Sequence, residues 1–173
     1  MRAPFAFASF AALFTFIGSL HAEEKRELDS HEHGHVTLQI AIEKNQMNIA
    51  FEAPGESIVG FEHAAKTDDQ KAKVEAAREQ LSDSAALFVL PPEAGCEVTS
   101  ADVQLHQEGN HNAFEASYAF TCSNTAILNA LETRLFALYP AIEEIDVDYI
   151  APSGQGSAEL EPAAPVVTFP PAS

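Results

Sequence analysis

Three histidines near the start of the chain have the type and spacing of metal ligands. His31, His33 and His35 occupy alternate positions around Glu32, and they directly precede residues 36–42, whose alternating apolar and polar side chains are typical of a β-strand. Because side chains two residues apart on a strand point to the same face, the three imidazoles can converge on one ion. Neutral imidazole nitrogen is a preferred ligand of Zn²⁺ and also binds copper.

The remaining composition favours zinc over copper. Beyond residue 22 the chain keeps a single methionine, Met47, so the Met-rich sites that favour copper(I) are absent. The expected mature N-terminus, Glu23-Glu24-Lys25, also lacks a third-position histidine for an amino-terminal copper(II) site. We therefore expect Zn²⁺ as the bound ion.

A fourth histidine, His63, is expected to complete this site. A hairpin turn near residues 44–45 would place His35 opposite Pro54, at the open end of the hairpin where the loop to His63 begins. We therefore predict a composite site of His33, His35 and His63, with His31 as a more distant collector. Three nearby carboxylates could serve as ligands or orient an imidazole: Glu32, Glu56 and Glu62.

Two further histidines, His106 and His111, flank a turn in the second half of the chain. The two histidines could form a second site, or one of them, such as His111, could supply a distal ligand. They could equally be two exposed turn residues, and the sequence leaves these alternatives open.

Functions other than metal capture have less support from the residues. A histidine cluster near the start of a chain can be a solvated segment of a structural or interaction module. A small zinc hydrolase would need a general base, for which Glu32 is the candidate, but no nucleophile or base with recognisable spacing follows His35. We expect no enzymatic activity and name no catalytic residue.

The first half of the domain, residues 33–92, is expected to form a ββαβ unit. Alternating patterns predict strands over 36–42 and 47–53, and a loop follows over 56–66. A capping-box pattern beginning at Thr67 starts a helix with Val74, Ala77 and Leu81 as its apolar stripe. A short strand over 85–90 completes the unit.

The second half, residues 95–165, is expected to repeat this order. Hairpin strands are predicted over 97–107 and 113–121, then a helix capped by Ser123-Asn124-Thr125 and stopped by Pro140. The apolar positions assigned to that helix are Ile127, Leu128, Leu131, Leu135 and Leu138. A strand over 145–150 closes the unit. The expected fold class is α+β, with two tandem ββαβ units forming a mainly antiparallel sheet with two helices in one compact domain. The Pro-rich tail, residues 166–173, is expected to be loose apart from one edge strand that 166–169 could add.

The chain has two cysteines, Cys96 and Cys122. If Gly109 is the centre of the second hairpin turn, residues whose numbers add up to 218 lie opposite one another, and the two cysteines satisfy this. We therefore predict a disulfide between them.

The N-terminal residues 1–22 have the pattern of a secretory signal peptide cleaved after Ala22. The alternative is a membrane anchor, but the apolar run over 5–20 is shorter than the ~20 residues that a spanning helix needs. The formal net charge of −17 disfavours nucleic-acid and anionic-membrane partners and attracts cations. An exported protein without membrane insertion is expected.

Motifs along most of the chain resemble the ZrgA-type periplasmic zinc-uptake proteins over about residues 31–165. They are His33-Gly34-His35, Glu52-Ala53-Pro54, Gly60-Phe61-Glu62-His63-Ala64, Gly95-Cys96, His111 with residues 114–122, residues 135–140, and Gly154-Gln155. The resemblance implies a non-enzymatic zinc-binding protein of the bacterial periplasm that works with a membrane zinc transporter. Members often carry a longer histidine-rich stretch before the position matching His111. This chain has only residues 106–111 there, which implies few zinc sites.

Overall fold

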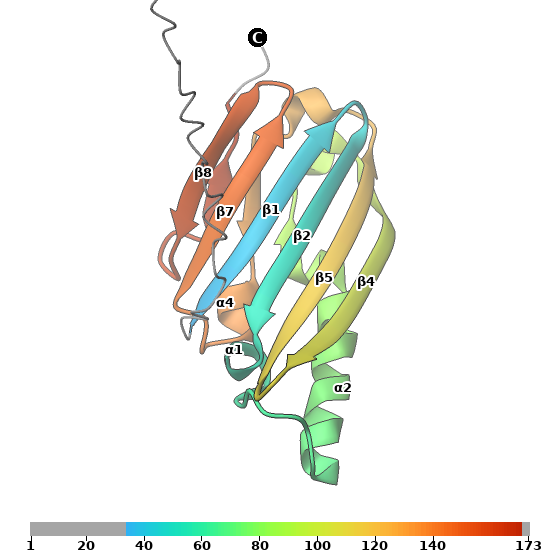
Figure 1. Ribbon diagram of the computed structural model, residues 1–173. Coiled ribbons are helices and arrows are strands. Elements are labelled where there is room, and N and C mark those ends of the chain that lie inside the picture. The colour runs from blue at the N-terminus through green and yellow to red at the C-terminus, as the bar shows by residue number, and fades with distance from the viewer. Residues whose placement is uncertain (1–33, 171–173) are drawn as a thin grey trace, which may run out of the picture.

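A six-stranded β-sheet forms the larger layer of the protein (Figure 1). The structure is a computed structural model and describes residues 34–170. The strands lie in the order β4-β5-β2-β1-β7-β8, and all neighbours are antiparallel except β1 and β7, which are parallel. Their bounds are β1 His35–Glu43, β2 Gln46–Pro54, β4 Cys96–Glu108, β5 His111–Cys122, β7 Glu144–Ala151 and β8 Gly154–Leu160.

The first hairpin follows the alternation in its sequence. In β1 the apolar residues Val36, Leu38, Ile40 and Ile42 are buried, and the intervening positions are exposed or half-buried. Glu43 pairs with Gln46, so the turn lies at residues 44–45 as predicted. The two strands and their register confirm the predicted hairpin.

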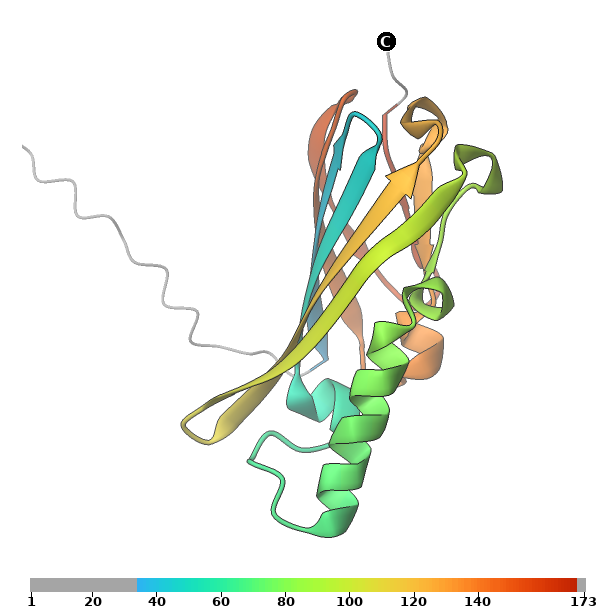
Figure 2. The same ribbon diagram turned by 90° about the vertical axis from the view of Figure 1, so that its right-hand side faces the viewer.

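The second layer lies on one face of this sheet and consists of helices and a small sheet (Figure 2). The small sheet has the order β3-β6-β9, and the buried apolar residues of both layers form one core cluster. The remaining elements are α1 Gly55–Val59, α2 Asp68–Ser82, α3 Ser84–Leu87, β3 Phe88–Val89, the 3₁₀ turns η1 Pro92–Ala94 and η2 Thr125–Ile127, β6 Ala130–Thr133, α4 Leu135–Leu138 and β9 Val166–Thr168. The α+β class and the single compact domain are confirmed.

Helix α2 is the longest helix of the described residues and has the predicted start and buried face. The Thr67 hydroxyl accepts from the Gln70 N–H, and the Gln70 side chain accepts from the Thr67 N–H, which completes the capping box. Its three buried residues are the predicted stripe of Val74, Ala77 and Leu81. The Tyr118 hydroxyl on β5 donates to the Leu81 carbonyl at 2.9 Å, which fastens the end of the helix to the sheet.

The predicted second helix, capped by residues 123–125 and stopped by Pro140, is wrong. Asn124 does cap a turn, accepting from the Ala126 N–H, but that turn is the short η2. The strand β6 follows, with Leu131 and Thr133 buried and Glu132 exposed, and only the four-residue α4 is helical. Because β6 pairs with β3 on one side and β9 on the other, sheet pairing overrides the helical spacing of the leucines.

Other elements also differ from the predicted order. The predicted strand over 85–90 is largely helix α3, and only Phe88–Val89 is strand; the expected loop over 56–66 begins with α1. Residues 154–160 form β8, which the sequence pattern did not indicate. Within the expected loose tail, residues 166–168 are the edge strand β9, held by the burial of Val167 and Phe169. The tandem ββαβ arrangement is not confirmed, and the described residues contain four α-helices rather than two.

The second hairpin carries the predicted disulfide, but the register of its strands differs from the expected one. Its turn has two residues, because Glu108 pairs with His111, so most of the hairpin is shifted by one from the expected register. A bulge between Val98 and Ser100 removes this shift and brings Cys96 opposite Cys122. Their sulfur atoms are bonded, which confirms the prediction.

The other face of the large sheet is not covered by helices (Figure 2). Its outward positions are mostly polar or small residues, as expected for a sheet with one solvated face. None of its six strands contains a Lys or an Arg. The charged groups of this open face are therefore carboxylates and histidines.

Candidate metal site

The histidines of the described residues gather at one end of the large sheet. This is the end where β1 begins, β2 ends and the β4–β5 hairpin turns, because Pro54 at the end of β2 pairs with Ala113 near the start of β5 (Figure 1). The histidines are His35, His63, His106 and His111. Histidines that are scattered in sequence therefore come from elements that meet at one end.

His35 is part of a three-residue cluster on the open face. It pairs with Glu144 across β1 and β7, and Asp146 lies one pleat further along β7. The ligand atoms of the three side chains all lie within 4.8 Å of one another, and no other such cluster occurs within residues 34–170. The His35 Nδ1 and Glu144 Oε1 atoms are 3.5 Å apart, and both side chains are about one-third exposed.

This spacing suits two ligands of one zinc ion. Bonds of about 2.0–2.1 Å in a tetrahedral site place neighbouring ligand atoms about 3.3 Å apart. The cluster offers one imidazole nitrogen and two carboxylates, which are accepted zinc ligands. A fourth position would remain for another protein ligand or water.

Gly34 aligns the two strands that carry this cluster. Its carbonyl accepts from the N–H groups of Glu143 and Glu144 at 2.8 and 3.2 Å, and its own N–H donates to the Ser57 hydroxyl at 3.2 Å. Its φ of 85° lies in the left-handed region, and a Cβ there would meet the Glu143 side chain at 3.0 Å. The left-handed backbone and the close approach of Glu143 therefore explain why the residue between His33 and His35 is a glycine.

His63 and His111 lie near each other on the neighbouring part of the same end. The Asn112 side-chain amide donates to the His63 carbonyl at 3.0 Å, which attaches the loop after α1 to β5. The His63 ring stacks on Phe61 with centroids 5.1 Å apart. This attachment places His63 against β5, two strands away from β1.

Both imidazoles are oriented through Nδ1. The His111 Nδ1 is 2.8 Å from a Glu62 carboxylate oxygen, and the His63 Nδ1 is 3.0 Å from the Ala64 carbonyl. Because these oxygens can only accept, each ring donates from Nδ1, and in a neutral ring Nε2 keeps its lone pair. Metal-ligating histidines usually have such an outer partner.

His106 and His111 do not pair with each other. The His106 Nε2 atom is 3.3 Å from the Glu115 Oε2 atom, whereas His111 contacts Glu62. The two turn histidines thus contact different glutamates.

The remaining predicted ligands, His31, Glu32 and His33, lie outside the described residues. The composite site of His33, His35 and His63 therefore stays a prediction. Sequence reasoning missed Glu144 and Asp146. Acidic residues alternate along the predicted strand over 145–150, which was the available signal. The sequence did not show which strand would pair with it.

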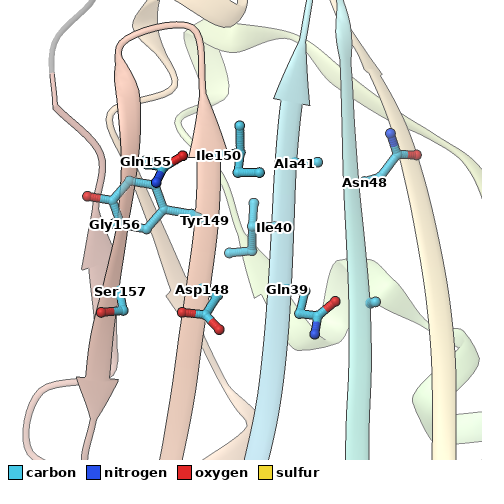
Figure 3. Close-up of a pocket in the computed structure, with 11 residues that line it drawn as sticks. Gln39, Ile40, Ala41, Asn48, Asp148, Tyr149, Ile150, Gln155, Gly156 and Ser157 are labelled. Carbon is cyan, nitrogen blue, oxygen red and sulfur yellow. The ribbon is translucent and has the colours of Figure 1, made fainter. Parts of the chain in front are cut away.

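A larger hollow on the open face lies further along the same strands (Figure 3). Its volume is about 690 Å³, and its lining contains one carboxylate, Asp148, and no histidine. In Figure 3, Gln39, Asp148 and Ser157 lie in one row across the neighbouring strands β1, β7 and β8. The residues that suit zinc are therefore at the sheet end rather than in this hollow.

A comparison with protein families agrees with the chemistry of the sheet end. The model of the ZrgA family zinc uptake proteins matches residues 30–169. The chain belongs to the ZrgA family. This match confirms the resemblance inferred from the motifs. Zinc uptake proteins are not an enzyme class.

Comparison with curated proteins gives no match. Within residues 34–170 of this ZrgA protein, no helix has the length and apolar character needed to cross a bilayer.

Proposed function

We propose that this ZrgA protein captures Zn²⁺ in the periplasm and supports its delivery to a membrane zinc-uptake system. The observation that carries the proposal is the cluster of His35, Glu144 and Asp146 on the open face of the sheet. The family match to zinc uptake proteins supports the choice of ion.

The proposed ligand set combines this cluster with the N-terminal histidines. His35 and the two carboxylates supply three ligands, and His33, two residues earlier in the chain, is the proposed fourth. His31 and Glu32 are proposed to collect or orient the ion on its way in. His63 and His111 are proposed as alternative ligands, since their Nδ1 atoms are already held by acceptors.

Exposure of the cluster suits a protein that must release its ion. The His35 and Glu144 side chains are 36% and 32% exposed, so water or a partner's ligand can reach them. The net charge of −17 raises the local concentration of cations around the protein. Both features support capture followed by exchange rather than permanent structural binding.

The periplasmic location is proposed from two features of the chain. Residues 1–22 have the pattern of a cleavable signal peptide, with cleavage after Ala22. The Cys96–Cys122 disulfide fits an oxidising compartment.

Zinc binding is tested by native mass spectrometry of residues 23–173 with limiting zinc. We expect a bound ion at micromolar zinc, and a rise in stability of about 2.7 kcal/mol when free zinc is 100 times the Kd. The His33→Ala/His35→Ala double variant should bind much more weakly. No binding by the wild type, or equal binding by the variant, would contradict the proposal.

Delivery is tested separately, by growth of the source bacterium under zinc chelation after deletion of this gene. The wild-type gene should restore growth, and the double variant should not. Restoration by both, with the variant shown to have lost zinc, would contradict a role of this site in uptake.

A further inference from the structure

We propose that Ser57 is a positioning residue of the zinc site. Its buried hydroxyl holds the backbone of Gly34, and Gly34 aligns His35 and Glu144, the first residues of β1 and β7. The inference deepens the proposed function and rests on it, because it requires that the cluster on these two strands binds the ion. Ser57 is not one of the proposed ligands, so it acts on the site through Gly34.

The parallel pairing of β1 and β7 explains why the cluster needs such a support. Antiparallel neighbours can be joined by a short turn that fixes their ends, whereas parallel strands are joined only through a long connection. The ends of this pair are held together by the Gly34 carbonyl, which accepts from the N–H groups of Glu143 and Glu144 at 2.8 and 3.2 Å. The orientation of the Gly34 backbone therefore determines how the start of β7 lies beside His35.

Gly34 cannot hold this orientation through its own conformational preference. Its φ is 85°, and a glycine adopts positive and negative φ values about equally readily. Gly34 is buried, and a buried N–H needs an acceptor. The Ser57 hydroxyl oxygen supplies that acceptor at 3.2 Å, and Ser57 is only 4% exposed. This hydrogen bond therefore selects one conformation of Gly34.

Helix α1 fixes the Ser57 hydroxyl independently of Gly34. The helix starts directly after β2, at the sheet end where β1 begins (Figure 1). Its first residue, Gly55, lies so close to Asn112 on β5 that an added Cβ would be 1.5 Å from the Asn112 Oδ1 atom. Asn112 is itself buried, and Val59 packs into the core at the other end of α1. The hydroxyl is thus presented by a helix that is packed at both ends.

A second buried serine allows a positioning role to be distinguished from a general role in folding. A hydroxyl that only stabilised the fold would not change the zinc affinity of protein that is already fully folded. Ser84 is also a helical serine and is 2% exposed. It lies in α3, which packs against α2, β3 and β4. Ser84 is therefore the matched control for a buried hydroxyl away from the zinc cluster.

Zinc titration against a chromophoric chelator, at a temperature where every protein is fully folded, tests the role of Ser57. Ser57→Ala should weaken zinc binding by about fivefold or more, somewhat less than the loss of a direct partner of a metal ligand, because Ser57 acts through Gly34. Ser84→Ala should leave the Kd unchanged. Equal Kd values for the wild type and Ser57→Ala would overturn the positioning role and leave the proposed function intact. No zinc binding by the wild type would contradict the proposed function, and this inference with it.

Hydrogen exchange of the wild-type protein gives a second readout, which does not depend on how well a variant folds. If Gly34 must keep its bond to Ser57 for zinc to bind, the Gly34 amide can exchange only from a state that has lost the ion. Free zinc at 100 times the Kd should then slow this exchange about 100-fold. The control is the Gly95 amide, which donates to the Pro92 carbonyl at the disulfide end of the sheet and should be unaffected. Equal exchange of the Gly34 amide with and without zinc would overturn the proposal.

Discussion

His35 and Glu144 are paired across the only parallel strand contact of the described large sheet, with the His35 Nδ1 3.5 Å from the Glu144 Oε1. The pairing places the first residue of β1 beside the first residue of β7. Because side chains on one strand face recur every two residues, Asp146 is added to the same side. The zinc site of this ZrgA protein is thus proposed to depend on the register of two strands that are distant in sequence.

Asp146 and Asp148 provide a matched pair for testing that register. Both are exposed on the same face of β7, but Asp148 pairs with Gln39, one pleat further from His35. Asp146→Asn should weaken zinc binding on the order of tenfold or more, as expected when a carboxylate of the site is lost. Asp148→Asn should leave the Kd nearly unchanged. Calorimetric titration of both variants measures the difference, and equal effects would contradict the assigned cluster.

Gly34→Ala should destabilise the start of β1. The left-handed φ of 85° disfavours a side chain by about 1–2 kcal/mol, and the new Cβ would press on the Glu143 side chain. Urea unfolding of the metal-free protein measures the loss in unfolding free energy, and zinc affinity should fall as His35 shifts relative to Glu144. Unchanged stability and unchanged affinity together would show that this backbone geometry does not position the site.

The protein should lose stability at alkaline pH because of two buried tyrosines. Burial raises the pKa of Tyr139 to about 12, and burial followed by the nearby Tyr139 raises the pKa of Tyr118 as well. Below a pH of about 10 both phenols are neutral in the folded and unfolded chain, so their contribution is fully present. As pH rises through 10 to 12, the unfolded state ionises first and stability falls.

Phenylalanine variants separate the two tyrosines in the same unfolding experiments. Tyr118→Phe removes the hydrogen bond to the Leu81 carbonyl and should cost about 1 kcal/mol at neutral pH. Tyr139→Phe removes a buried hydroxyl that has no hydrogen-bond partner, so it should be neutral or stabilising. Each variant should show a smaller loss of stability above pH 10 than the wild type. An unchanged alkaline profile in both would argue against burial as the cause.

Removing the disulfide should lower stability without affecting the zinc site. Cys96 and Cys122 are 26 residues apart, and closing a loop of this length stabilises by about 3.5 kcal/mol in the chain-entropy model. The disulfide lies at the end of the hairpin opposite His106 and His111. We expect Cys96→Ser/Cys122→Ser to unfold at lower urea and to bind zinc with the same Kd. A large loss of affinity in a folded variant would contradict this separation of the two ends.

Local patterns in the sequence predicted the elements that are stabilised mainly by contacts between residues close in sequence. The β1–β2 hairpin follows from strict alternation around a short turn, and α2 follows from the capping box at Thr67 and the spacing of its buried residues. The disulfide was predicted from a register that was wrong by one residue over most of the hairpin. The bulge near Val98, which no sequence pattern indicated, restored the pairing of the cysteines.

Elements that depend on distant pairing could not be predicted in the same way. Leu128, Leu131 and Leu135 have helical spacing, yet Leu131 lies in a strand because β3 and β9 flank it. The acidic partners of His35 were missed for the same reason, because the parallel pairing of β1 with β7 brings together strands that are far apart in the sequence. The histidines were recognisable from their spacing, but the carboxylates beside them required the topology.

The most direct test of the central claim is a crystal structure of residues 23–173 with one equivalent of zinc, using anomalous scattering at the zinc edge. The account predicts an anomalous peak bonded to the His35 imidazole and to a carboxylate oxygen of Glu144 or Asp146. A peak at another position, with these three side chains free of metal, would contradict it.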